Sequence, residues 1–163
     1  MKNFPLIIVL VIPFFCGCGE KLPDGMEKLY PTKLVITQKG KPLVGASVRL
    51  ISSASDTSNQ WTVGALTDEQ GVATIRTHGS YDGAPAGKYK VCVTKTVDEN
   101  PPLDPSSSED GIRARAERAK KIFSIVPKEY KSELSTPFEV EIKGKTHQAF
   151  DIPEEVKEQA GLI

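Results

Sequence analysis

The sequence is poor in cysteine, histidine and aromatic residues, and it has no excess of either charge. Its 163 residues include three cysteines and two histidines, and its 21 basic residues balance 21 acidic ones. A balanced chain lacks the basic excess of a nucleic-acid-binding domain, so no nucleic-acid partner is predicted. Its longest apolar run spans residues 4–15 and contains Pro5 and Pro13. A spanning helix needs roughly 20 apolar residues, so this run is too short to cross a bilayer.

The N-terminus has the order of a secretory signal peptide. Lys2 precedes the apolar run, which ends in Phe15-Cys16-Gly17-Cys18, and a small residue marks the cleavage site of such signals. This segment resembles the lipobox of bacterial lipoproteins, in which a small residue precedes a cysteine that receives diacylglycerol and becomes the new N-terminus. The resemblance implies that residues 1–17 are a signal peptide and that Cys18 carries fatty-acyl chains such as palmitate. The alternative is an ordinary signal peptide cut nearby, with Cys16 and Cys18 incidental.

Lipid attachment would make the bilayer the first partner of this chain, through an N-terminal diacylglyceryl cysteine. Two or three acyl chains give a stable anchor, whereas a single chain binds only marginally. Gly19 follows Cys18, and by resemblance to enterobacterial sorting the absence of aspartate there favours the outer membrane. The predicted location is the cell envelope, periplasmic or surface-facing. Cys92 would be the one thiol left, so no internal disulfide is expected.

The rest of the chain alternates short β patterns with turn signals, which predicts an all-β fold. Residues 18–31 are rich in glycine, proline and charge and are expected to form a tether. Strands are expected at residues 33–37, 45–51, 61–67, 72–77, 88–97, 138–142 and 147–152. Turn residues at 67–71 and at 143–145 predict a hairpin at each place. About seven short strands without long apolar helices predict a β-sandwich over residues 32–153.

Two segments depart from this strand pattern. Residues 100–130 are expected to be an insertion, in which Ser106 and Glu109 are spaced as a capping box for a short helix that runs to about Phe123. The tail from residue 154 to residue 163 is expected to be a frayed helix. Within residues 88–97, Tyr89 is expected in the core, whereas Cys92 shares the more polar face.

Three segments, in order, resemble carboxypeptidase regulatory-like domains, which are transthyretin-like β-sandwiches. They are residues 40–48, the turn at residues 67–71, and residues 85–91. The ending, residues 126–130 and then 140–152, resembles small lipoproteins built on this domain. The resemblance implies a transthyretin-like or Ig-like sandwich in the cell envelope, and it supplies no activity because this fold hosts many functions.

No pattern predicts a catalytic, metal or cofactor site. Transthyretin-like hydrolases of 5-hydroxyisourate need, by resemblance, several histidines and a C-terminal Tyr-Arg-Gly-Ser, which this chain lacks. His78, His147 and Cys92 are scattered, which disfavours a zinc site or a Cys-His pair. Asp68 and Glu69 lack the ligand alternation of a calcium loop. A Ser-His-Asp triad stays open on residue counts alone, although no nucleophile elbow is present.

Aromatic residues at loops are the predicted ligand contacts. Trp61 follows a polar loop, and Tyr81 lies beside Asp82 in a loop rich in glycine and proline. Aromatic faces can stack on sugar rings or anchor a protein, although Trp61 could instead lie in the core and Tyr81 could brace its loop. The basic run at residues 113–121 could contact anionic lipid or polysaccharide, or be a solvated helix face.

These observations predict a membrane-anchored, non-catalytic binding or structural module that contacts an envelope protein or a polysaccharide. The alternative is a cell-envelope hydrolase or metal-dependent enzyme on a transthyretin-like fold. Metal analysis of the purified protein separates the two.

Overall fold

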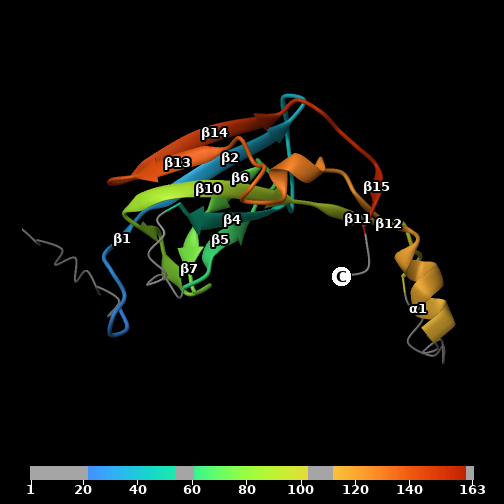
Figure 1. Ribbon diagram of the computed structural model, residues 1–163, viewed down its shortest axis with the longest axis horizontal. Coiled ribbons are helices and arrows are strands. Elements are labelled where there is room, and N and C mark those ends of the chain that lie inside the picture. Colours follow the sequence, from blue (N-terminus) through green and yellow to red (C-terminus); the bar gives the residue numbers. More distant parts are fainter. Residues whose placement is uncertain (1–21, 54–60, 103–111, 161–163) are drawn as a thin grey trace, which may run out of the picture.

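The structure is a computed structural model that describes residues 22–53, 61–102 and 112–160. Two β-sheets face each other around one core, and a smaller sheet with a helix extends from one end (Figure 1). Strands dominate the described residues, and α1 (Ile112–Ala119) is their one α-helix. The predicted all-β sandwich with a short helical insertion is therefore confirmed.

The larger sheet has six antiparallel strands. Its order is β13 (Glu139–Ile142), β10 (Gly87–Thr94), β4 (Ser47–Ser52), β5 (Val63–Leu66), β7 (Arg76–Thr77) and β8 (Tyr81–Asp82). In the central strands every second residue is buried, as in Val48 and Leu50 of β4 and Tyr89, Val91 and Val93 of β10. This period of two places one face of the sheet on the core and turns the other away from it.

The second sheet is built around β2. Its strands are β14 (Thr146–Ile152), β2 (Thr32–Gln38), β3 (Lys41–Pro42) and β6 (Val72–Thr74). Strand β14 runs parallel to β2 along all seven residues of each, and β6 and β3 pair with the opposite edge of β2. The side chains of Leu34 and Ile36 are fully buried and form part of the core.

Aromatic packing closes the core near one end. The ring centroids of Tyr130 and Phe138 lie 4.9 Å apart, and those of Phe138 and Phe150 lie 4.8 Å apart. Tyr130 belongs to the 3-10 helix η1 (Lys128–Tyr130), and Phe150 belongs to β14. Tilted ring pairs at this spacing add stability beyond the area they bury, so the end of the insertion is part of the core.

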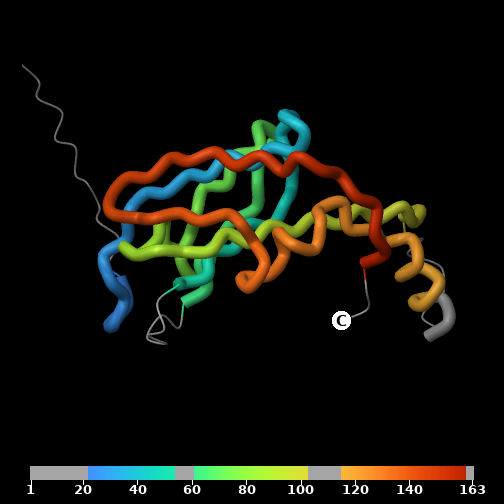
Figure 2. Tube along the Cα trace, turned by 45° about the horizontal axis from the view of Figure 1, so that its top comes forward, coloured from blue at the N-terminus to red at the C-terminus, as the bar shows by residue number. Residues whose placement is uncertain are grey.

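The extension consists of β11 (Thr96–Asp98), β12 (Ile122–Ser124), β15 (Glu158–Gln159) and α1. Gln38 joins it to the sandwich: its buried amide Nε2 donates to the carbonyls of Ile125 and Glu154, both at 2.8 Å. Strand β1 (Leu29–Tyr30), paired with β9 (Ala84–Pro85), lies at the opposite end of the molecule (Figures 1 and 2). The last residues of the predicted tether are thus strand residues.

The second predicted hairpin is wrong. Residues 143–145 do form a turn, but β13 pairs with β10 in the larger sheet, whereas β14 pairs with β2 in the other sheet. The turn carries the chain from one sheet to the other (Figure 2). Turn chemistry predicts a reversal of the chain, and it does not determine which strands pair afterwards.

The turn of the first predicted hairpin is confirmed. The predicted second strand, residues 72–77, forms two separate strands, β6 and β7. Asp68 Oδ1 accepts hydrogen bonds from the amides of Gln70 and Val72, at 2.9 and 2.8 Å, and Gly71 has a φ of 74°. After this turn β6 pairs with β2 of the second sheet, and the following strand β7 pairs with β5 of the larger sheet. Residues 72–77 therefore belong to both sheets in succession.

The insertion and the tail also differ from their predictions. The helix ends at Ala119, and Phe123 lies in β12, because the chain pairs there with β11 and β15. The predicted capping residues Ser106 and Glu109 lie outside the described residues. The tail contains strand β15 in place of a helix, since Phe123 and Ser124 supply it with an edge to pair with.

Candidate ligand-binding face

The six-stranded sheet turns one face away from the core, and this outer face carries the candidate site. Backbone register aligns one residue from each of five neighbouring strands across it. The row is Cys92, Arg49, Gly64, Arg76 and Asp82. Side chains of one row share a face of the sheet, so two guanidinium groups lie on either side of a glycine.

Arg49 is exposed, and it forms no ion pair or hydrogen bond with any residue that the structure describes. Lysines toward the β13 edge of this face lie beside glutamates: Lys90 pairs with Glu139 at 2.6 Å, Lys143 pairs with Glu141 at 2.9 Å, and Lys88 stands opposite Glu141 in the register. Arg49 therefore keeps all five guanidinium donors available to a ligand.

Gly64 lies between the two arginines and leaves the backbone surface there, called the floor below, without a side chain. A Cβ atom at this position would lie 2.4 Å from the carbonyl oxygen of Val48, because β4 approaches β5 closely there. A glycine inside a strand often marks such a close approach of backbone. Any other residue would push the strands apart, so the floor stays free of a side chain.

Two hollows adjoin at Arg49. One, of about 280 Å³, is lined by Arg49, Ser52, Trp61 and Thr62, and also by the core residues Leu50, Val63 and Tyr89, so it reaches the end of the sandwich. The other, of about 300 Å³, is lined by Arg49, Thr62, Gly64, Leu66 and Arg76, among others. Arg49 and Thr62 line both hollows, so the two adjoin, and they are together called the depression. Their volumes are at the lower end of those that hold small ligands.

Arg76 is partly engaged. Its Nε donates to Asp82 Oδ1 at 2.9 Å, with both side chains more than half exposed. Exposed pairs of this kind contribute little to stability, about 0–1 kcal/mol. The bond uses Nε, which leaves the terminal nitrogens of Arg76 for another acceptor.

The predicted contact residues lie at one side of this depression. Trp61 is partly buried, and its ring meets that of His78 edge to face, with centroids 5.3 Å apart. Tyr81 is also partly buried and pairs with Thr77, on the side of the sheet that faces the core. Asp82 is exposed on the outer face, where it binds Arg76. The structure therefore places Trp61 in the lining of one hollow and Asp82 against Arg76, which lines the other, whereas Tyr81 of the edge strand β8 faces the core side.

Sequence reasoning missed Arg49, Arg76 and His78. Arg49 occupies a polar position of a period-two pattern, where a solvated side chain is the ordinary expectation. Its importance depends on the strand beside it, and a glycine inside the strand at residues 61–67 was the available signal. His78 adopts a left-handed φ of 55° before Gly79, which holds its ring against Trp61.

Cys92 lies in the same row but is inaccessible. It is 3% exposed, since η1 and the residues after it pack against β10, where Thr136 Oγ1 donates to the carbonyl of Val91 at 2.8 Å. Its predicted place on the polar face agrees with its register opposite Arg49, but the side chain is covered. Burial raises the pKa of the Cys92 thiol, with the Arg49 charge acting in the opposite direction. A buried neutral thiol is a poor nucleophile.

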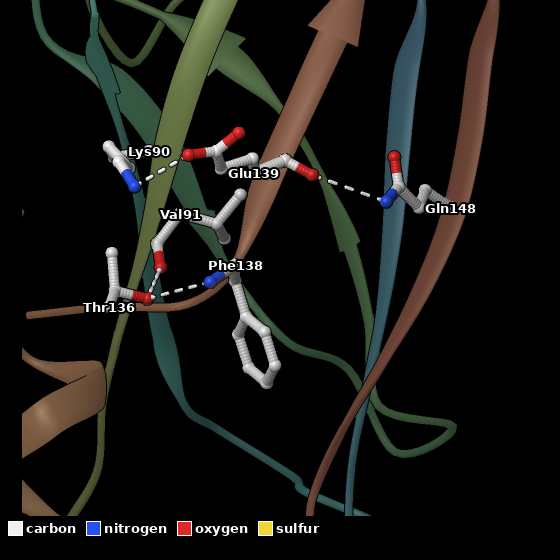
Figure 3. Close-up of polar contacts among 6 residues, drawn as sticks. All are labelled: Lys90, Val91, Thr136, Phe138, Glu139 and Gln148. Atoms are coloured by element: carbon white, nitrogen blue, oxygen red, sulfur yellow. Dashed lines mark hydrogen bonds and ion pairs between the residues drawn. The ribbon is translucent and has the colours of Figure 1, made fainter.

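One edge of the outer face is closed by polar contacts (Figure 3). Gln148 of β14 donates from Nε2 to the backbone carbonyl of Glu139 in β13, at 3.2 Å, and the Glu139 side chain binds Lys90. The hydrogen bond from Lys90 lowers the pKa of the Glu139 carboxyl below its usual range. An occupied carbonyl and a charged side chain discourage the addition of another strand at Glu139.

The described residues contain no cluster of three or more histidine, cysteine, aspartate or glutamate side chains that could hold a metal ion. None of the helices in the described part of the chain is both long and apolar enough to span a bilayer.

No family model, no curated protein and no solved structure matches this chain.

Proposed function

We propose that this protein is a lipid-anchored bacterial envelope protein whose β-sandwich is a non-catalytic binding module. The observation that carries the anchor is the segment Phe15-Cys16-Gly17-Cys18 at the end of a short apolar run. The anchor is a diacylglyceryl group on Cys18, and the predicted membrane is the outer membrane.

The position of β1 is consistent with such an anchor. Leu29 is eleven residues after Cys18, and a fully extended chain of that length reaches about 35–40 Å. A turn closed by a hydrogen bond from the Met26 amide to the carbonyl of Pro23 shortens this reach. The sandwich would therefore remain close to the membrane, with β1 toward the bilayer and the extension pointing away (Figure 1).

The binding role is supported by the outer face of the larger sheet. It offers an arginine that has no ion-pair or hydrogen-bond partner among the described residues, a floor without a side chain and a tryptophan at its side. A shallow, open depression with polar donors suits the recognition of a ligand, and none of the described residues that line it forms a nucleophile–base pair. We also propose that the sandwich is transthyretin-like, as the resemblance of residues 40–48, 67–71 and 85–91 implies.

Two cysteine variants test the anchor. In Cys18→Ser cells the protein should leave the membrane fraction and lose the mass of its acyl chains, whereas the control Cys16→Ser should leave both unchanged. A Cys18→Ser protein that stays membrane-bound with an unshifted mass would refute the anchor.

Crosslinking in intact cells tests the binding role. A module of this kind should give specific adducts with an envelope protein or a polysaccharide through the outer face. If photo-crosslinkers at Thr62 and at Leu66 yield only the uncrosslinked protein, the sandwich has no partner on that face and the binding role is wrong.

A further inference from the structure

The two arginines of the outer face are spaced for a ligand with more than one acidic group. Arg49 in β4 and Arg76 in β7 flank β5, and neighbouring strands are about 4.8 Å apart, so their backbones are separated by roughly 10 Å. Each guanidinium can bind one carboxylate through two parallel hydrogen bonds. A chain that carries acid groups at intervals can therefore occupy both arginines.

Charge on this face favours an anion at the depression. Of the lysines at the β13 side, Lys90 and Lys143 form ion pairs with glutamates and Lys88 stands opposite Glu141 in the register. Arg49 has no such partner among the described residues, and Arg76 has a single bond to Asp82. Guanidinium groups match carboxylates in shape and bind them through paired hydrogen bonds. The unmatched positive charge therefore lies at the depression itself.

The lining suits a saccharide better than a protein surface. Hydroxyl-bearing side chains line both hollows, and Leu66, which is 69% exposed, is the large exposed apolar side chain of the second. A stable protein interface buries about 800 Å² on each partner around an apolar centre. Trp61, at one side of the depression, provides the aromatic surface on which sugar rings pack.

We propose that the outer face binds an acidic polysaccharide, a chain of uronic acid type, along the line from Trp61 to Arg76. Arg49 binds one carboxylate, Arg76 binds another through its terminal nitrogens, and the chain crosses the floor at Gly64. This inference rests on the proposed binding function and names its ligand class.

Titration with polysaccharides tests it, using the full mature protein purified from membranes in mild detergent. The probes are polygalacturonate and alginate as uronate chains, dextran as a neutral chain, and poly-L-glutamate as a carboxylated chain without sugars. The variants are Arg49→Gln, Arg76→Gln and Trp61→Ala, with Lys33→Gln as the matched control, since Lys33 is exposed on the other sheet. Urea midpoints show that each variant is folded.

We expect at least one uronate chain to bind. We expect the affinities for dextran and poly-L-glutamate to be lower by about tenfold or more. Arg49→Gln should weaken the uronate affinity by about tenfold, as the loss of a charge-assisted hydrogen bond does. Arg76→Gln should weaken it by a smaller factor because Asp82 already holds that side chain. Lys33→Gln should leave the affinity unchanged within about twofold, since surface charges beyond a Debye length are screened.

Three outcomes would overturn the inference. Equal binding of poly-L-glutamate would mean that charge alone is recognised, equal effects of Arg49→Gln and Lys33→Gln would place the site elsewhere, and no binding of either uronate chain would exclude the ligand class. In each case the crosslinking experiment decides the proposed function independently, because a protein partner captured at Thr62 or Leu66 would preserve a binding role without a polysaccharide.

Discussion

Gln38 holds the extension to the sandwich, and its replacement should loosen that junction. Its amide donates two hydrogen bonds of 2.8 Å, to the carbonyls of Ile125 and Glu154, and its side chain is 8% exposed. In Gln38→Leu both carbonyls lose their donor. An unpaired carbonyl costs about 1–3 kcal/mol, and the lower end applies because the Ile125 carbonyl also accepts from the Val156 amide. The expected loss in the free energy of unfolding is about 2 kcal/mol.

Gln38→Glu sharpens this prediction because it replaces the donating amide by an accepting oxygen of the same shape. The carboxyl would face two carbonyl oxygens in a buried place, which raises its folded-state pKa above the unfolded value. A raised folded pKa means that stability is present at low pH and is lost as the pH rises through the folded pKa. Gln38→Glu should therefore approach wild-type stability near pH 4 and fall below Gln38→Leu at pH 8.

Urea unfolding with two probes measures both variants. Trp61 fluorescence reports on the sandwich, and hydrogen exchange of the β12 amides reports on the extension. A loss of about 2 kcal/mol with an m-value of about 2 kcal/mol/M lowers the urea midpoint by about 1 M. If Gln38→Leu leaves both the midpoint and the β12 exchange unchanged, or if Gln38→Glu shows no pH dependence, the two hydrogen bonds do not hold the extension.

Three further predictions follow from single contacts. Gly64→Ala should destabilise the fold by about 2 kcal/mol or more in urea unfolding, because its Cβ would overlap the carbonyl of Val48; an unchanged midpoint would show that the strands separate easily. Cys92 should resist thiol reagents at pH 7 until the protein unfolds, since burial raises its pKa; stoichiometric labelling of the native protein would contradict its burial. NMR titration should give the Asp151 carboxyl a pKa below the usual aspartate range, because Thr37 donates a hydrogen bond to it. Thr37→Val should raise that pKa; an unchanged pKa would contradict this cause. The stabilising contribution of Asp151 is present above its unfolded-state pKa and is lost as the pH falls through its folded-state pKa.

The positions of the strands could be predicted from sequence, because alternation along one strand reflects its own half-buried environment. Residues 33–37 and 147–152 fall within β2 and β14 as expected. Their pairing could not be predicted, since a strand of period two looks the same beside any partner. The parallel contact between β2 and β14 joins residues more than 100 positions apart, and no local pattern carries that information.

Of the residues at the candidate site, the sequence pointed to Trp61 and Asp82 only. Trp61 stood out because a lone tryptophan after a polar loop is conspicuous in the sequence. Arg49 and Arg76 are ordinary exposed arginines until the register aligns them across Gly64. A site built from one residue on each of several strands depends on the order of the strands, which is a property of the folded sheet.

The central claim is that this chain is processed and acylated at Cys18, and the mass of its N-terminal peptide tests it most directly. The protein would be extracted from membranes and digested, and the mass of its N-terminal peptide would be measured. The claim predicts an N-terminus at Cys18 that carries a diacylglyceryl group and its fatty-acyl chains. An N-terminus at any other residue, or an unmodified thiol on Cys18, would contradict it.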